Sequence, residues 1–496
     1  MSFATEITKS TAKHRVLVEI DFGQLNTQWV NIGAGIWVVS ATNAYAWVDA
    51  SLLDGFTAQD FDIIGSVKAS GVNLDYRPSL ETIEEGTYYY NPITRALYVC
   101  LFAYDEPFIH IMTIGILTGY SISGFVPVNG PAYFEGRLAK IPSISKQRDP
   151  LFFGRIAFGG STIDLLNGDG ALDAWGYSTD IYGQDVRILF GFDTLDYADY
   201  AKIFSGYVQT VEVGEDRVSL RIDDKRKQLT KPITYTCTAV NALEAIEGVL
   251  HEAYGYNYNQ YAYDTTAWEI ARAEVEDVTI NMQEPKPVIE VIEDIAASVF
   301  GLFTVTTNGK FSFRIVDTED TIDRIIDYYD IANQHAITYD PTEVVSSVRV
   351  GYARDWTTTG TQYTYLSDTS EQATVFALYK TYNERKFDTL LPDLTAAQSF
   401  ATRVLNYASR IHGSETVMIP IENYDLVLGQ QIGVVVQRGA QSMIGELKAE
   451  VTGVNYDLER AAINATIRHG GALEAFLKLE DDAILISEAD ALMMED

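Results

Sequence analysis

Two segments far apart in this chain follow the same pattern. Residues 204–222 read FSGYVQTVEVGEDRVSLRI, and residues 451–467 read VTGVNYDLERAAINATI. Each begins with an apolar residue, then Ser or Thr, then Gly, and each carries an apolar residue seven positions on, Val211 or Leu458. Each then turns through acidic residues into an alternating strand, which is the signal of a β-hairpin. A duplication of this kind predicts two related β-barrels, one in each half of the chain.

The two hairpins share a glycine, Gly206 in the first and Gly453 in the second. A glycine inside a strand marks a bulge or the close approach of another backbone. We therefore expect both glycines to be structural residues, and a side chain at either one to disturb both barrels alike.

Other segments show clear strand or helix periodicity. Residues 14–22 alternate as a half-buried strand, with Val16, Val18, Ile20 and Phe22 on one face. Three further segments carry apolar residues at helical spacing and predict helices, namely 239–254, 288–303 and 395–411.

The length of 496 residues exceeds what one core holds, since domains of roughly 100–200 residues predict three to four units. The patterns predict a mainly β, multidomain fold with α+β modules. Its expected parts are a first β-barrel domain (1–22 and 125–235), an inserted β-rich domain (23–124), a middle α+β domain (236–335), a second β-barrel or closing domain (336–470) and an acidic C-terminal tail (471–496).

The inserted block is rich in Gly, Tyr and Asn and contains the hairpin pattern TYYYNPITRALYVC, with Asn91-Pro92 as its turn. Tyr88, Tyr89 and Tyr90 have two interpretations. Their rings could stack on a sugar, or they could pack across neighbouring strands of a small sheet. Both interpretations stay open on the sequence.

The net charge of −33 excludes several functions. Such a surface repels nucleic acid and anionic membranes, so we expect no specific nucleic-acid binding. Cys100 and Cys237 are too few for a disulfide scaffold. The first residues lack the apolar core of a signal peptide, and no uncharged apolar run reaches the roughly 18 residues of a membrane span. We expect synthesis in a cytoplasm and no membrane-spanning segment.

Motifs of catalysis or metal binding are weak. His251-Glu252 begins like a zinc-protease motif, but Gly255 stands where the second ligand is needed. Residues 169–173 faintly resemble a calcium loop, although a plain turn explains them better. Four carboxylates have no feature that distinguishes them from solvated surface: Asp317, Asp320, Glu422 and Asp425. We therefore expect no enzyme activity, cofactor or metal.

The C-terminal tail, LKLEDDAILISEADALMMED, repeats with a step of eight, which places Leu477, Leu485 and Met493 in one apolar column. A step of eight suits strands better than coiled-coil helices, which repeat every seven residues. A frayed terminus is the alternative.

A family resemblance enters through the order of several segments. They are PAYFEGRLAKIPSISKQRDPLFFGRIAFGGSTIDLLNGDGALDAW, the hairpin at 204–222, VIEVIEDIAASVFGLFTVTTNGKFSFRIV, and AAQSFATRVLNYASRIHG with the later VLGQQIGVVV. This order resembles the tail hub proteins of tailed phages, over about residues 1–22 and 125–470. The inserted block is a departure from a minimal hub.

The resemblance implies a homotrimer in which two tail-tube-like β-barrels per chain form a pseudo-six-fold ring. That ring would adapt a six-fold tail tube to a three-fold tip, with DNA passing through its lumen. The implied partners are a tail tube or distal tail protein and a central spike or fibre, and the implied location is the virion. Three copies of the tail could pair into a small β-prism. The alternative function is a receptor- or glycan-binding tail-tip protein that acts through residues 23–124.

Overall fold

The computed structural model describes most of the chain. It covers residues 13–25, 30–33, 36–40, 64–69, 72–73, 75–76, 87–91, 96–100, 112–124, 127, 134–148, 159–176, 181–256, 258, 262–316, 322–327, 330–331, 338–340, 343–357, 362–438 and 443–469. Within residues 21–118 the description is of the course of the strands. The fold is mainly β with a few helices, as the sequence predicts.

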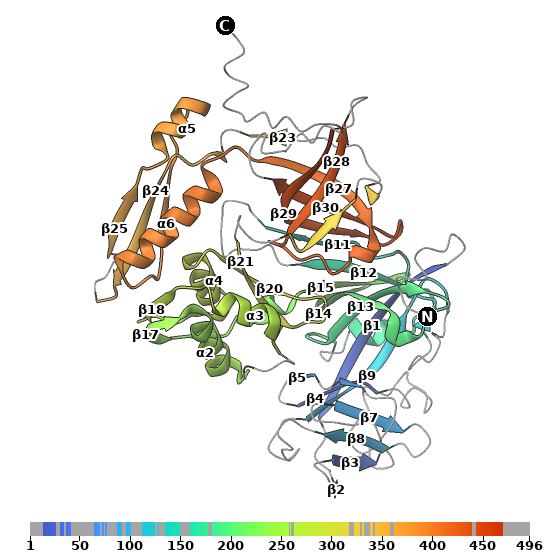
Figure 1. Ribbon diagram of the computed structural model, residues 1–496. Helices are drawn as coiled ribbons and strands as arrows, with labels where there is room; N and C mark the ends of the chain where they lie inside the picture. The colour runs from blue at the N-terminus through green and yellow to red at the C-terminus, as the bar shows by residue number, and fades with distance from the viewer. Residues whose placement is uncertain are drawn as a thin grey trace.

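The first β-barrel is closed. Its strands follow the order β12-β15-β14-β13-β1-β9-β10, and Leu138, just beyond β10, bridges back to Leu165 of β12. The strands are β1 (His14–Leu25), β9 (Met112–Tyr120), β10 (Phe134–Glu135), β12 (Gly160–Leu166), β13 (Asp185–Phe192), β14 (Ala201–Val213) and β15 (Arg217–Asp223). Figure 1 shows these strands between the blue strands of the insert and the red strands of the C-terminal half.

From Val16 to Ile20, strand β1 is buried on both faces, although its alternation predicts a half-buried strand; the side chain of Phe22 lies outside the described residues. Val18 and Ile20 lie in the barrel core as predicted, and Leu17 is equally buried on the opposite face. Glu19 is buried there as well, where its carboxylate accepts a hydrogen bond of 2.8 Å from Arg187. Covering elements outside the barrel therefore bury a face that the sequence pattern marks as solvent-exposed.

The insert consists of strands alone in its described residues. A five-stranded sheet has the order β2-β3-β8-β7-β6, and β4 and β5 instead extend the barrel sheet beyond β9. The elements are β2 (Val30–Gly33), β3 (Ile36–Ser40), β4 (Ile64–Ala69), β5 (Val72–Asn73), β6 (Asp75–Tyr76), β7 (Thr87–Asn91) and β8 (Ala96–Cys100). The predicted aromatic hairpin is confirmed, since Asn91 pairs with Ala96 at the closed end of β7 and β8.

The middle module packs helices against short two-stranded sheets. Its elements are β16 (Pro232–Ile233), β17 (Thr236–Asn241), α2 (Ala242–Tyr254), α3 (Thr265–Arg272), β18 (Asp277–Asn281), β19 (Lys286–Pro287), α4 (Val288–Ser298), β20 (Gly301–Val305) and β21 (Phe311–Ile315). Helix α4 ends earlier than the predicted residue 303. Phe300 takes a left-handed backbone conformation (φ 60°), which ends the helix and turns the chain into β20.

A three-stranded sheet with one covering helix follows. It has the order β25-β24-β26, and α6 packs on β24 and β25. The elements are β24 (Ser347–Asp355), β25 (Gln362–Asp368), α5 (Gln372–Tyr379), β26 (Glu384–Asp388) and α6 (Leu394–Ala408). Figure 1 shows α5 at the outer end of this sheet, far from the insert.

The second sheet repeats the topology of the first barrel. Its described strands have the order β23-β27-β30-β29-β28-β22. They are β22 (Arg324–Ile326), β23 (Thr338–Tyr339), β27 (Gly413–Pro420), β28 (Gln431–Arg438), β29 (Met443–Asp457) and β30 (Ala462–His469). Here β27-β30-β29-β28 matches β12-β15-β14-β13 in spatial order, in chain order and in antiparallel pairing. In the described part of the chain no pairing joins β22 to β23.

A β-bulge lies in the central strand of each repeat. The register of β14 shifts at Gln209, and the register of β29 shifts at Thr452. The two predicted structural glycines lie on opposite sides of these bulges, Gly206 before the first and Gly453 after the second. The bulges, rather than the glycines, therefore mark the equivalent positions of the two repeats.

The two glycines also differ in the space around them. A Cβ atom on Gly206 would lie 2.2 Å from the backbone oxygen of Asp223, whereas one on Gly453 would lie 3.1 Å from the Cβ of Thr466. We predict that Gly206→Ala lowers the free energy of unfolding by about 1–3 kcal/mol, because backbone cannot yield as a side chain can. Gly453→Ala is the matched control and should cost less than half as much. Urea unfolding followed by tryptophan fluorescence measures both, and equal losses would contradict the prediction.

Candidate functional site

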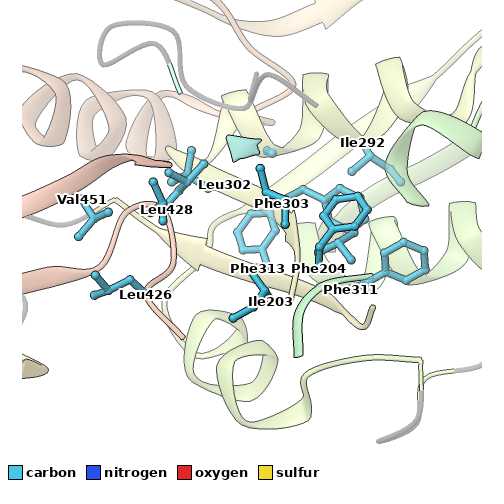
Figure 2. Packing of buried hydrophobic residues seen from close by; sticks show 14 of the residues in the cluster. Ile203, Phe204, Ile292, Leu302, Phe303, Phe311, Phe313, Leu426, Leu428 and Val451 are labelled. Carbon is cyan, nitrogen blue, oxygen red and sulfur yellow. The ribbon is translucent and has the colours of Figure 1, made fainter. Parts of the chain in front are cut away.

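The two repeated sheets meet the middle module at one apolar junction. Figure 2 shows side chains from β14, from the β20–β21 hairpin and from the C-terminal half converging there. The labelled residues are all buried: Ile203, Phe204, Ile292, Leu302, Phe303, Phe311, Phe313, Leu426, Leu428 and Val451. Because residues of all three parts share this core, the repeats and the middle module are held as one body.

Polar contacts fix the hairpin to the first barrel. Ser205 of β14 donates a 2.6 Å hydrogen bond to the backbone oxygen of Thr307, in the turn of the hairpin. Arg226, just after β15, donates to the backbone oxygen of Phe303 at 3.2 Å. The same guanidinium is held by Asp224 at 2.7 Å, and both side chains are buried. A buried arginine with its charge paired is thus used to bind a backbone carbonyl across the junction.

The other side of the hairpin receives a loop from the second half. Leu426 and Leu428 project from this loop into the junction. Gly429 follows with φ 82°, and a Cβ atom there would lie 2.7 Å from Leu302. Only glycine combines that conformation with so close an approach. The β20–β21 hairpin is therefore held between the two repeats.

A buried ion pair joins the two repeats directly. Strand β11 (Ile144–Gln147) pairs with both β12 and β29, so one continuous sheet runs through both repeats. Arg148 follows β11 and is fully buried, and its guanidinium pairs with Glu450 of β29, 302 positions away. Tyr407 of α6 accepts a 2.7 Å hydrogen bond from Arg148 and donates one of 2.7 Å to Glu450. These three residues, here called the Arg148 triad, link three parts of the fold.

A second arginine and a histidine lie beside the triad. The guanidinium of Arg468 lies 4.8 Å from the ring centroid of Tyr407, and its Nη2 atom pairs with Glu343 at 3.7 Å. The ring of His412 lies 5.6 Å from that of Tyr407. Burial, and after it the charge of Arg468, lowers the pKa of His412 to about 3. His412 is therefore neutral in the folded protein at ordinary pH.

One open crevice lies at the end of the first barrel. Its volume is about 610 Å³, and it is lined by Glu135, Gly136, Arg137, Leu166, Gly168 and Asp169. Arg137 is held by Asp169 at 2.6 Å and by Glu135 at 2.5 Å. Hydrogen bonding to Asp169 raises the pKa of Arg137, and the same bond lowers the pKa of Asp169. Among the described residues that line the crevice, Arg137 is the one cation, and its charge is paired with two carboxylates.

The sequence motifs that resemble catalytic or metal-binding sites have structural explanations. Gly255 is the left-handed C-cap of α2, at φ 73°, which accounts for its place after His251. In the turn at 169–173, Asp173 accepts a 2.7 Å hydrogen bond from Asn167. Asp425 is bound by Arg324 through two bonds of 2.7 and 2.9 Å. Among the described residues no group of three His, Cys, Asp or Glu side chains could hold a metal.

The remaining predicted residues are spread over the chain. Val211 pairs with Leu220 in the first hairpin, whereas Leu458 is buried in the turn of the second, so the two are not equivalent. Tyr88, Tyr89 and Tyr90 pair along β7 with Val99, Tyr98 and Leu97 of β8. Leu477, Leu485 and Met493, like Asp317 and Asp320, lie outside the described residues.

The Arg148 triad is absent from the sequence-based candidates. Nothing near Arg148 in the sequence indicates a buried cation, and its partner lies in the other half of the chain. Glu450 occupies a stretch of β29 that is buried on both faces, so its position breaks no alternation. A charged residue between apolar ones in a strand with no solvent face is the one signal that could have found it.

The sequence and fold of the chain can be compared with those of known proteins. No family model matches the chain, and no curated protein matches it either. Among solved structures it is similar to a tail protein from Neisseria meningitidis MC58, with 10% identity, a TM-score of 0.43, and coverage of 67% of this chain and 94% of that one.

It is also similar to the 43 kDa tail protein of prophage MuSo2 from Shewanella oneidensis, at 12% identity and a TM-score of 0.39, covering 68% of this chain and 94% of that one. The E. coli c3393 protein, a component of the type VI secretion system, matches at 10% identity and a TM-score of 0.36, covering 70% and 76%. Because each TM-score is below 0.5, no function is carried over from these structures. None of the described helices has the length and apolar character needed to span a membrane.

The Arg148 triad predicts a non-additive pair of mutations. Arg148→Met alone should lower the free energy of unfolding by about 3–5 kcal/mol, because it leaves Glu450 buried without its cation. Arg148→Met with Glu450→Leu should recover most of that loss, since two apolar side chains pack without a charge. A double-mutant cycle in urea measures the coupling. Arg460→Ala at an exposed pair 3.7 Å from Asp457 is the control, with a cost of less than about 1 kcal/mol. Additive losses in the cycle would refute the triad's role.

His412 predicts a loss of stability in acid. Its folded pKa of about 3 lies below the ordinary value of 6.5, so its contribution is complete above pH 6.5 and is lost as pH falls towards 3. The slope of this loss is about 1.4 kcal/mol per pH unit. His412→Phe keeps a ring beside Tyr407 and takes up no proton. The free energy of unfolding of the variant minus that of wild type should therefore increase as the pH falls from 6.5 to 4 and stay constant above pH 7. Urea unfolding at each pH measures this difference. A difference that does not change with pH would contradict this.

Proposed function

We propose that this chain is the structural hub of a phage tail tip or baseplate, a homotrimer that joins a six-fold tail tube to three-fold tip components. The observation that carries the proposal is the repeat of one four-stranded topology, β12-β15-β14-β13 and β27-β30-β29-β28. Two such units in each chain give six in a trimer. A ring of three chains would therefore present six similar sheets to a six-fold partner and three equal faces to a three-fold partner.

The rigidity of the junction supports this role. A ring subunit that carries load between two partners needs its two repeats fixed relative to each other. Here β11 pairs with a strand of each repeat, and Arg148 is buried beside it. Two hinged domains would instead keep a polar, weakly packed interface.

The charge supports passage of DNA rather than its binding. Each chain brings a net charge of −33, and a ring multiplies that charge by three. A lumen that repels phosphate lets DNA slide without contact. We further propose that residues 471–496, with Leu477, Leu485 and Met493 in one column, bring the three chains together at the axis. The chain would be made in the host cytoplasm and act in the virion, beside a tail tube or distal tail protein and a central spike or fibre.

Electron microscopy of the purified protein tests the proposal. Class averages viewed down the axis should show rings with three-fold or pseudo-six-fold symmetry, and native mass spectrometry should give three times the chain mass of 55.2 kDa. The chain lacking residues 472–496 should need a higher concentration to form the same ring. Protein that stays monomeric alone and in the presence of tail tubes would overturn the proposed function. If the chain lacking residues 472–496 forms rings equally well, only the role proposed for residues 471–496 is overturned.

A further inference from the structure

Helix α5 is apolar on nearly every side but packs against little. Its sequence is QATVFALY, with no charged residue, and Val375 is its one buried side chain. A helix that is hydrophobic all round is normally enclosed by protein. Here Leu378 is 62% exposed and Phe376 is 40% exposed, at the outer end of the three-stranded sheet. Both side chains therefore present apolar surface to solvent in the single chain.

The exposed surface around α5 has a fixed shape. Tyr382, 63% exposed, stacks on Phe376 with ring centroids 4.5 Å apart and planes 16° from parallel. Lys380 ends the helix in a left-handed conformation, at φ 56°, with its backbone N–H bound to the oxygen of Phe376. Its ammonium donates to the backbone oxygen of Ala377 at 2.8 Å. We call Phe376, Leu378, Lys380 and Tyr382 the α5 patch. Such an ordered apolar surface with one cation is typical of a docking site.

Charge identifies the occupant. Lys380 is the one charged residue of the α5 patch, and its ammonium is bound to the backbone oxygen of Ala377. Lys386, further along, is already paired with Asp388 at 3.1 Å and adds no net charge to this surface. The whole chain carries 36 Lys and Arg against 69 Asp and Glu, so the patch is cationic on a strongly acidic molecule. The average surface of another copy is therefore complementary to the patch, whereas two α5 patches would repel each other through their lysines.

We propose that the α5 patch docks on an acidic face of the neighbouring copy of this chain, forming the lateral contact of the ring. The inference rests on the proposed function and adds the surface that closes the ring. Because the patch meets a different surface on its neighbour, the contact is heterologous, and such a contact generates a ring when the rotation between neighbours closes.

Surface substitutions test the inference without altering the core. Leu378→Glu in the full-length chain should raise the concentration at which half the protein is assembled at least tenfold, as measured by sedimentation velocity. Lys380→Glu should weaken assembly in a salt-dependent way, since it reverses the complementary charge. Ile270→Glu on α3 is the matched control, because Ile270 is also 62% exposed and lies outside the patch. It should leave assembly unchanged, and circular dichroism melting should show that all three variants are folded.

The outcomes separate the two proposals. If wild type forms rings and Leu378→Glu forms them equally well, the α5 patch is not the contact and the hub proposal stands. If wild type forms no rings with or without tail tubes, both proposals fail. A photoreactive phenylalanine analogue at position 378 should crosslink to a second copy at an acidic segment. Crosslinking only to a different tail protein would overturn the choice of occupant.

Discussion

The architecture depends on one buried charge pair between the halves of the chain. Arg148 and Glu450 lie where strand β11 joins the second sheet, and Tyr407 of α6 completes the contact. A charge pair out of water contributes little net stability, but either partner alone is costly, so the pair tolerates only one alignment of the sheets. Apolar packing could accept a slip of register, whereas the Arg148 triad cannot. The relative position of the repeats, on which a ring would depend, is set by this geometry.

The middle module fixes the two repeats in that alignment as one rigid unit. Its β20–β21 hairpin is bound by Ser205 and Arg226 on one side and packed against Leu428 on the other. Each contact uses a backbone carbonyl or a leucine that no sequence motif marks. The acidic surface and the exposed α5 patch are then the features through which this body would meet other molecules.

The local parts of the fold follow from the sequence, and the contacts between them do not. Residues 242–254, 288–298 and 394–408 form helices where apolar periodicity predicts them, and the repeated hairpins were visible as a pattern. The sequence does not predict helix α5, because the helix lacks an apolar stripe and so shows no hydrophobic period of 3.6 residues. Gly206 and Gly453 match in the sequence but not in strand register, because the bulge of β14 follows Gly206 whereas that of β29 precedes Gly453, and no sequence pattern marks either bulge. The Arg148 triad depends on partners 302 positions apart, which a single sequence cannot pair.

The sharing of β11 between both repeats has a consequence for synthesis. Its partner β29 is translated some three hundred residues later, which at about 5–20 residues per second is a delay of roughly 15–60 s. From the completion of β15 (Arg217–Asp223) until β29 is made, β11 beside the first barrel presents an unpaired strand edge on the ribosome. The strand is only Ile144–Gln147 and carries Lys146, and short length with a lysine is how natural sheets keep an open edge from recruiting other chains. The four residues that later join the two halves thus form a strand edge that is short and charged enough to avoid pairing with other chains before β29 is made.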